Sequence, residues 1–239
     1  MKPLVFAGPS LHGLAIGPCD AFDLAPPAAC GDVMRAAIGG REVIGLIDGM
    51  FESGPTVWHK EILFALAAGR RIFGAASMGA LRAAECWQFG MVGVGAIFED
   101  YRTGRRSSDA DVALIHGPAE LSYMPLSVPL VDVEDRVDRL LAARALTTAS
   151  AAILLRQARW LHFKRRTWER MLSVPGIGAG ERQGILSWIG ADGPSAKGRD
   201  ALQLLEHIAE PLRVEPTAVA FAHTRFSERL FHCIVGADK

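Results

Sequence analysis

The strongest chemical signal in the sequence is a serine surrounded by small residues. Residues 74–80 read GAASMGA, in which Ser77 follows a short apolar run and precedes an alanine-rich segment that favours a helix. Small neighbours permit a tight turn from strand to helix that exposes a hydroxyl, and the amide of Met78 would then stabilise an oxyanion. This is the pattern of a nucleophile elbow, except that Ala75 stands in place of the first glycine of G-x-S-x-G. The alternative is that Ser77 only caps the following helix.

A serine nucleophile needs a base, and the base needs a group that orients it. His59 and His116 are the candidate bases, and Asp48 is the candidate that orients the ring and stabilises its charged form. The local sequence does not choose between the two histidines, and each of them also fits a structural role. Asp48 followed by Gly49 also fits an ordinary turn.

Two further charged residues lie on the helix predicted after the serine. Arg82 and Glu85 are three residues apart, so they either hold an anionic ligand or pair with each other. His, Cys and carboxylate residues do not gather at metal-ligand spacing, so neither a metal nor another cofactor is expected.

The elements that position these residues alternate between strands and helices. Short apolar runs predict strands at residues 4–6, 43–47, 71–73 and 112–115, and helical spacing predicts helices at residues 57–68 and 78–87, with another ending at residue 101. This order predicts an α/β fold with a mostly parallel sheet and crossover helices. Ligands bind beyond the carboxyl ends of such strands, so Asp48 and Ser77 are expected at one rim of the sheet if their strands are neighbours.

The pattern changes to a 3.6-residue period from about Val131 onward. We therefore expect residues 1–130 to form the α/β core and residues 131–239 to form a mostly helical C-terminal region. Within that region, residues 156–170 combine six basic residues with Trp160, Phe163 and Trp168. Such a segment either docks an acidic partner or RNA, or forms a solvated basic face whose aromatic rings pack inward.

Composition restricts the class of protein. The 239 residues carry 26 Lys and Arg against 26 Asp and Glu, a net charge of zero, which argues against a nucleic-acid partner bound by general phosphate attraction. No uncharged apolar run reaches the length of a membrane helix, so no membrane partner is expected. The four cysteines show no CxxC spacing, and a reducing, cytoplasmic location is the simplest expectation.

Several ordered segments resemble the TfuA-like protein family. The resemblance extends over roughly residues 3–130, and a looser match lies near residues 197–205. It is carried by IDGMF at 47–51, VWHKEIL at 57–63, GAASMGALRAAE at 74–85 and FGMVGVG at 89–95, and also by residues 5–11, 31–32 and 109–116.

This resemblance implies a role beside YcaO proteins, the ATP-using enzymes that activate backbone amides, in replacing a peptide oxygen with sulfur. The implied partners are a YcaO protein, a ubiquitin-like sulfur-carrier protein and a precursor peptide. The implied reaction is hydrolysis of the carrier's thiocarboxylate to release sulfide. The candidate substrate-binding residues are Gly49, Lys60, Glu61, Met78, Gly79, Arg82 and Glu85.

Two other functions fit the same residues. One is a non-catalytic adaptor that docks the carrier, the peptide and the YcaO protein. The other is a peptidase, because GAASMGA and residues 115–118 look like the serine and histidine segments of Clp-type serine peptidases, although the final Asp of that triad has no assignable counterpart.

Overall fold

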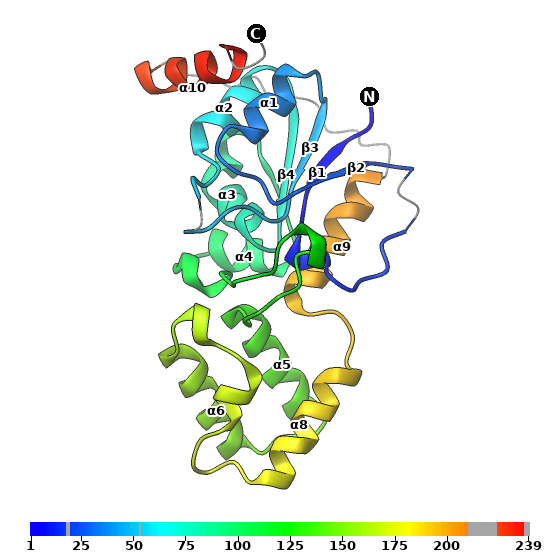
Figure 1. Ribbon diagram of the computed structural model, residues 1–239, viewed down its shortest axis with the longest axis vertical. Helices are drawn as coiled ribbons and strands as arrows, with labels where there is room; N and C mark the ends of the chain where they lie inside the picture. The colour runs from blue at the N-terminus through cyan, green and yellow to red at the C-terminus, as the bar shows by residue number, and fades with distance from the viewer. Residues whose placement is uncertain (18–19, 53, 210–223, 237–239) are drawn as a thin grey trace. The chain divides into compact units, whose positions relative to one another are not determined.

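The computed structural model describes residues 1–17, 20–52, 54–209 and 224–236 (Figure 1). It divides into two compact units, the first formed by residues 1–107 with the described residues from 199 onward, and the second by residues 108–198. The predicted boundary between residues 130 and 131 differs from this division and stays a prediction. Residues 210–223 and 237–239 of the predicted helical region lie outside the described residues.

The first unit contains one parallel sheet of five strands, which confirms the predicted α/β fold. The strand order is β2-β1-β3-β4-β5, so β3 and β4 are neighbours, with Leu46 opposite Gly74. The strands are β1 (Leu4–Phe6), β2 (Asp23–Ala25), β3 (Val43–Leu46), β4 (Arg71–Ala75) and β5 (Val92–Val94). Because β3 and β4 run side by side in one direction, the loops that carry Asp48 and Ser77 leave the same edge of the sheet.

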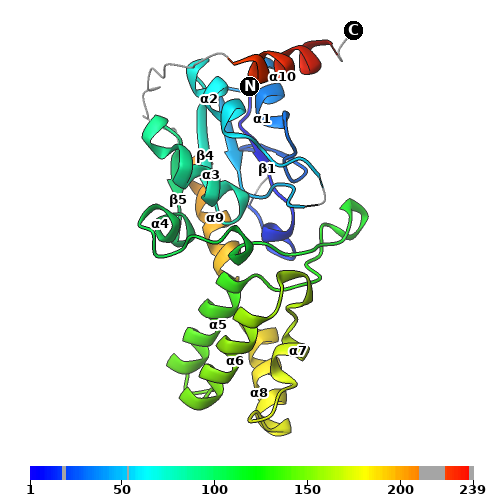
Figure 2. The ribbon, with the colours of Figure 1, turned by 90° about the vertical axis from the view of Figure 1, so that its left-hand side faces the viewer.

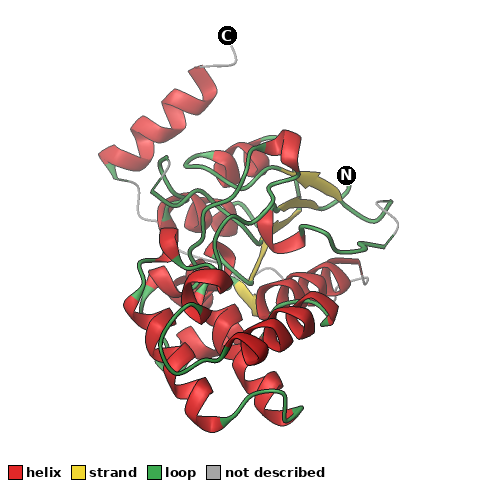
Figure 3. Cartoon of the chain, turned by 60° about the horizontal axis from the view of Figure 1, so that its bottom comes forward, coloured by secondary structure: helices red, strands yellow, loops and turns green. Residues whose placement is uncertain are grey.

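Helices cover both faces of this sheet, and Figure 3 shows the strands in yellow among them. Along β4, Phe73 and Ala75 pack in one apolar cluster with Leu204 and Ile208 of α9, whereas Gly74, between them, approaches α3. Alternate residues of a strand point to opposite faces, so α9 lies on the face opposite α3 (Figure 1). The helices of this unit are α1 (Asp32–Ile38), α2 (His59–Ala67), α3 (Met78–Cys86), α4 (Ala96–Arg102), α9 (Ala196–Ala209), which begins in the second unit, and α10 (Arg225–Gly236).

The second unit is helical around its own core (Figure 2). Its helices are α5 (Leu130–Ala142), α6 (Thr148–Trp160), α7 (Trp168–Leu172) and α8 (Ala179–Ala191). The core is formed by buried apolar side chains, among them Val133, Val137 and Leu140 of α5, Leu154 of α6 and Met171 of α7. Among the helices of the described ranges, none combines the length and the apolar character that a membrane crossing needs.

The predicted strand at residues 112–115 is wrong. Val112 and Ala113 are buried, as an apolar run suggests, but they follow a 3₁₀ turn at Asp109–Asp111 and do not join the sheet. The Ile115 amide donates instead to the Ser127 hydroxyl, and the Ile115 carbonyl accepts from the Leu126 amide. The apolar run therefore indicates burial correctly and indicates the wrong backbone conformation.

The structure also contains elements that go beyond those predicted, namely β2, β5 and α1. β5 has only three residues, and its central Gly93 favours a turn when the sequence is taken alone. In the fold this glycine leaves room for an aromatic ring, because a Cβ atom there would lie 2.2 Å from Phe98. A glycine that makes space for a neighbour is indistinguishable, by local sequence, from a glycine that bends the chain.

Candidate active site

A tight turn joins β4 to α3 and carries the candidate nucleophile. Ala76 is fully buried and has φ +64°, and the Ser77 amide donates to the Ala75 carbonyl two residues back at 2.8 Å. A non-glycine residue with positive φ is uncommon and costs on the order of 1–3 kcal/mol. The chain therefore turns as sharply as the small residues suggested, with the unusual conformation at Ala76, one residue before the serine.

The Ser77 side chain stands at the N-cap position of α3 without acting as a cap. Ser77 is partly exposed, and its hydroxyl accepts no hydrogen bond from the amides of the first turn of α3. The Ser77 backbone carbonyl, by contrast, accepts from the amides of Ala80 and Leu81 in the ordinary helical manner. The capping alternative thus accounts for the position of Ser77 and leaves its hydroxyl available.

The first amides of α3 differ in what they bind. The Gly79 amide donates to the Ile47 carbonyl at 3.2 Å. The Met78 amide, next to Ser77, has no hydrogen-bond acceptor among the described residues. An unbonded amide at a helix N-terminus beside a hydroxyl is the arrangement that an oxyanion requires.

Two glycines of the GAASMGA segment bring α3 against the sheet. A Cβ atom at Gly79 would lie 1.7 Å from the Leu46 carbonyl oxygen, and one at Gly74 would lie 2.2 Å from the Gly79 carbonyl oxygen. Both distances are shorter than any real contact, so backbone passes directly over backbone here. Gly49 likewise packs closely against Met78 at the start of α3, because a Cβ atom at Gly49 would lie 2.9 Å from Met78 Cγ. The predicted binding residues Gly49 and Gly79 thus fix the position of the turn.

Asp48 lies at the expected edge of the sheet, and its carboxylate holds the loop after β1. Its Oδ2 accepts from the amides of Gly8 and Ser10 at 2.9 and 3.0 Å, and its Oδ1 accepts from the Ser10 hydroxyl at 2.7 Å. Asp48 is only 2% exposed. Ser10 follows β1 as Asp48 follows β3, and the pairing of these two strands brings the serine and the carboxylate together.

His59 is bound to Glu85, at the start of α2. Its Nε2 lies 2.7 Å from Glu85 Oε2, which also accepts from the Arg82 guanidinium at 2.6 Å. Arg82 is buried and its Nε donates to the Val57 carbonyl at 2.8 Å. Arg82 and Glu85 therefore pair with each other, and the pair holds the histidine.

The charges around Glu85 change its acidity. Burial acts to raise the pKa of the Glu85 carboxyl, but the hydrogen bond from His59 and the charge of Arg82 outweigh it, so the net pKa is lowered. A carboxylate can only accept, so the neutral His59 ring donates from Nε2 and keeps Nδ1 as its acceptor. Glu85 follows Ser77 by eight residues, about 12 Å along the axis of α3. In this structure the His59 ring thus contacts Glu85, a residue about two turns after Ser77 on α3.

Glu61 serves two helix termini. It is fully buried, and its carboxylate accepts from the Trp58 amide at the start of α2 and from the amides of Gly31 and Val33 at the start of α1. Burial raises the pKa of the Glu61 carboxyl, and the backbone amides oppose that rise. Lys60, its neighbour, is partly exposed. Glu61 thus has a structural role in this fold, and substrate binding by Glu61 and Lys60 stays a prediction.

His116 belongs to the second unit and adopts a defined tautomer. Its Nδ1 lies 2.7 Å from the Gly117 carbonyl oxygen, and its ring meets the edge of Tyr123 at a centroid distance of 5.7 Å. A carbonyl oxygen can only accept, so Nδ1 carries the proton and the neutral ring keeps Nε2 as its acceptor. The Gly117 carbonyl accepts the hydrogen bond from Nδ1 and so fixes the tautomer of the ring, as the carboxylate does in a Ser-His-Asp triad.

The structure brings Asp48 and Ser77 to one edge of the sheet and holds His59 further along α3. It assigns His116 to a different compact unit. Within the described part of the chain, no three His, Cys, Asp or Glu side chains gather in a way that would hold a metal ion.

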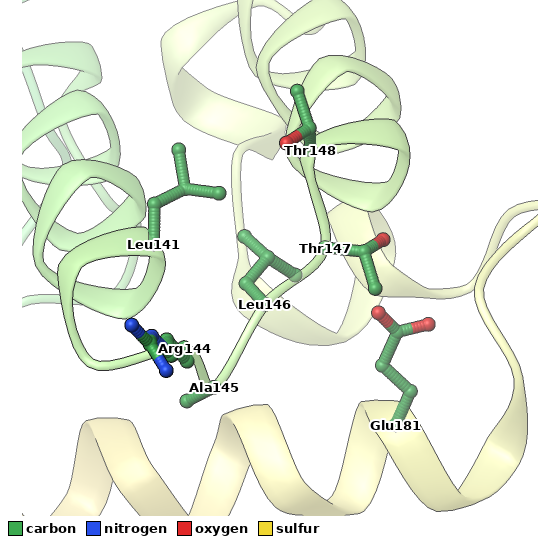
Figure 4. A pocket seen from close by; sticks show the side chains of 7 residues that line it. All are labelled: Leu141, Arg144, Ala145, Leu146, Thr147, Thr148 and Glu181. Atoms are coloured by element: carbon green, nitrogen blue, oxygen red, sulfur yellow. The ribbon is translucent and has the colours of Figure 1, made fainter.

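A separate hollow opens in the second unit (Figure 4). It has a volume of about 590 Å³ and lies between the end of α5, the start of α6 and Glu181 of α8. Glu181 Oε1 is buried there without a hydrogen-bond partner among the residues that the structure describes. Its lining residues are Leu141, Arg144, Ala145, Leu146, Thr147, Thr148 and Glu181. The hollow contains none of the residues predicted from the sequence.

Comparison with models of protein families gives a match. Residues 48–167 match the sequence model of a family described as TfuA-like protein, so the match covers half of the chain. The matched segment includes Asp48, His59, Ser77 and His116. No curated protein matches the chain.

Proposed function

The chain belongs to the TfuA-like protein family and has a TfuA-type role in a YcaO-associated pathway, and we propose that it supplies sulfide there by hydrolysing a thiocarboxylated sulfur-carrier protein. The observation that carries this proposal is the pairing of the partly exposed Ser77 hydroxyl, which makes no capping bond, with the unbonded Met78 amide. The first can attack a carbonyl carbon, and the second can receive the charge that develops on its oxygen.

The reaction is an acyl transfer in two steps. In the first, Ser77 Oγ bonds to the thiocarboxylate carbon, its proton passes to an imidazole, and the carbon–sulfur bond breaks so that sulfide leaves and takes up that proton as HS⁻. In the second, water gives one proton to the same imidazole and attacks the acyl-serine carbon, the bond from that carbon to Ser77 Oγ breaks, and the imidazole returns the proton to Oγ. The carrier carboxylate is released, and the second proton of the water passes to solvent. No oxidant or reductant is needed.

The base in these steps is one of the two histidines predicted from the sequence. His116 is supported by its tautomer, because the Gly117 carbonyl holds Nδ1–H and leaves Nε2 to take a proton. His59 is supported by its bond to Glu85, which would stabilise the charged ring. The hydrogen bonds of Asp48 to Gly8 and Ser10 support a structural role for that carboxylate.

The test is sulfide release from a purified, thiocarboxylated carrier by the purified protein. Ser77→Ala is expected to abolish release, whereas Ser187→Ala, at an exposed serine of α8, is expected to leave it unchanged. His116→Gln and His59→Gln are compared in the same assay, and the variant with the larger loss identifies the base. An undiminished rate in Ser77→Ala would remove the nucleophile and leave a mechanism in which water attacks directly.

A second candidate is the adaptor that docks carrier, precursor peptide and YcaO protein without catalysis. The hydrogen bonds of Asp48, the predicted orienting acid, to the loop after β1 favour it, because they engage both carboxylate oxygens that a serine–histidine–aspartate triad would need for the histidine. Co-purification with the YcaO protein, together with no sulfide release by the protein alone, is its expected signature. A peptidase would instead cleave unmodified peptides and react with a fluorophosphonate at Ser77.

A further inference from the structure

The C-terminal end of α6 exposes an aromatic side chain that the fold does not use. Trp160, the last residue of α6, is 78% exposed. The neighbouring aromatic residues behave differently, because Phe163 is buried and Trp168 is half-buried in the apolar core of the second unit. An indole is mainly apolar and carries one donor, and tryptophan is enriched among the residues that anchor binding partners.

Cationic residues lie before and after this tryptophan in the chain. Arg156 precedes Trp160 by four residues on α6, a spacing that makes two side chains neighbours on a helix surface. Arg159 is adjacent to it in sequence and is also exposed. The 3₁₀ turn Phe163–Arg165 follows directly and exposes Lys164 and Arg165.

A buried arginine holds this turn against the end of α6. The Arg166 guanidinium donates to the Ala158 carbonyl at 2.8 Å and to the Leu161 carbonyl at 3.2 Å, which fills the acceptors at the C-terminus of the helix. Arg166 is 4% exposed, and burial lowers the pKa of its guanidinium. The turn just before Arg166 is therefore held near the C-terminal end of α6, where Trp160 lies. We call Arg156, Arg159, Trp160, Lys164 and Arg165 the Trp160 surface.

The ion pairs of the described residues neutralise part of the charge of the Trp160 surface. Arg159 pairs with Glu134 at 2.9 Å. Arg156 and Arg165 have no acidic partner within residues 1–17, 20–52, 54–209 and 224–236. Exposed cations beside an exposed indole form a surface that is complementary to carboxylates interspersed with apolar side chains.

We propose that the Trp160 surface binds an acidic peptide segment, with the indole contacting an apolar side chain and the arginines contacting flanking carboxylates. The identity of the natural ligand as the peptide modified by the YcaO partner rests on the proposed function. The preference of the surface for acidic and apolar side chains does not depend on that function. RNA is the weaker candidate, because the chain has a net charge of zero and surfaces that bind single-stranded RNA stack several bases on several aromatic rings.

The binding test uses fluorescein-labelled synthetic peptides in an anisotropy titration of the full chain. One peptide alternates glutamate and leucine, and its control has glutamine in place of each glutamate. We expect the acidic peptide to bind at least about tenfold more tightly than the control, with binding weakened by salt. Equal binding of the two peptides, or tighter binding of an oligouridylate of the same length, would overturn the proposal.

Matched variants locate the binding site. Trp160→Ala and the double variant Arg156→Glu/Arg165→Glu are each expected to weaken peptide binding about tenfold or more. Trp87→Ala is the aromatic control, since Trp87 is 44% exposed and is already covered by Arg102 at 5.8 Å, and Arg144→Glu is the charge control. Equal losses in the controls and in the Trp160-surface variants would show that the peptide binds elsewhere.

Two further measurements separate this proposal from the proposed function. Thermal unfolding of Trp160→Ala should match that of the unchanged chain, because the side chain is exposed. Sulfide release from the thiocarboxylated carrier should also be unchanged in Trp160→Ala. A chain that binds the acidic peptide through Trp160 but releases no sulfide would disprove the hydrolase alone, and one that releases sulfide without binding the peptide would disprove the peptide surface alone.

Discussion

Two serines follow strands of the same sheet and have opposite environments. Ser10, after β1, is 6% exposed and its hydroxyl donates to Asp48, whereas Ser77, after β4, is partly exposed and its hydroxyl makes no capping bond. Both are preceded by small or turn-forming residues, so the local sequence treats them alike. The difference shows that a hydroxyl at the edge of a sheet stabilises the fold when it forms a hydrogen bond with a buried partner. A hydroxyl without such a bond is available for chemistry.

The largest effect expected from this comparison is on activity. Ser77→Ala should reduce sulfide release by roughly 10³-fold or more, as loss of a serine nucleophile does, and should leave the free energy of unfolding within about 0.5 kcal/mol. Ser10→Ala should do the reverse, lowering stability by about 1–2 kcal/mol. Turnover of carrier and urea midpoints, measured on the same two preparations, check both. The comparison fails if the two variants lose activity and stability in the same proportion.

Removal of the Asp48 carboxylate, which binds Ser10, is a stronger test of how much this contact stabilises the fold. Asp48→Ala leaves the donors of Gly8 and Ser10 buried without acceptors, so we expect a loss of about 3–4 kcal/mol in the free energy of unfolding. Urea denaturation measures this loss. Asp48→Asn, which keeps one oxygen, should lose less. Unchanged stability in Asp48→Ala, combined with abolished turnover, would return Asp48 to the catalytic role predicted from the sequence.

The glycine under the Ser77 turn links stability and activity. In Gly79→Ala the new methyl group would overlap the Leu46 carbonyl, so α3 must shift, at a cost of about 2–3 kcal/mol, and the hydroxyl shifts with it. Gly184→Ala in α8 is the control, because a Cβ there meets nothing within 4 Å and should add up to about 1 kcal/mol of stability. Urea midpoints and turnover should both fall in the first variant. Turnover that persists in Gly79→Ala would mean that the turn has no fixed geometry to lose.

The smallest effect concerns Glu85 and acid stability. Because the folded-state pKa of Glu85 is below its ordinary value of 4.5, its ion pairs stabilise the fold above that value and are lost as pH falls through the lowered pKa. Glu85 is partly exposed and its pairs are screened by solvent, so Glu85→Gln should cost less than about 1 kcal/mol at neutral pH. The difference between variant and unchanged chain should vanish below the lowered pKa. Urea midpoints measured across acidic pH check this, and a difference that grows in acid would contradict the lowered pKa.

The sequence predicts the central part of the first unit well because its signals are local there. Three strands and three helices between residues 4 and 102 produce apolar runs or helical spacing that a short window contains. The neighbouring placement of β3 and β4 follows from a general rule about parallel sheets, which is why Asp48 and Ser77 were expected at one edge. The small residues on both sides of Ser77 likewise predict the tight turn there.

The missing parts depend on contacts between residues far apart in sequence. Nothing near Asp48 indicates that Gly8 and Ser10 will occupy its oxygens, and nothing near Glu61 indicates that it will cap α1 as well as α2. Trp160 gives the converse case, because one of the two alternatives for residues 156–170 has the aromatic rings packed inward, and the fold leaves the Trp160 ring exposed. In each case the environment of the side chain depends on which distant residues the fold brings next to it. The local sequence pattern carries no information about those residues.

The place of α9 in the chain affects when the first unit can finish folding. Asp200 accepts from the amides of Ala96 and Ile97 at the start of α4, and the apolar side chains after it cover one face of the sheet. A ribosome synthesises the five strands first and must then make the whole of the second unit before this helix emerges. During that interval the nascent sheet has an uncovered apolar face, so chaperone binding to the growing polypeptide, and aggregation when synthesis halts early, should concentrate in the stretch of translation between β5 and α9.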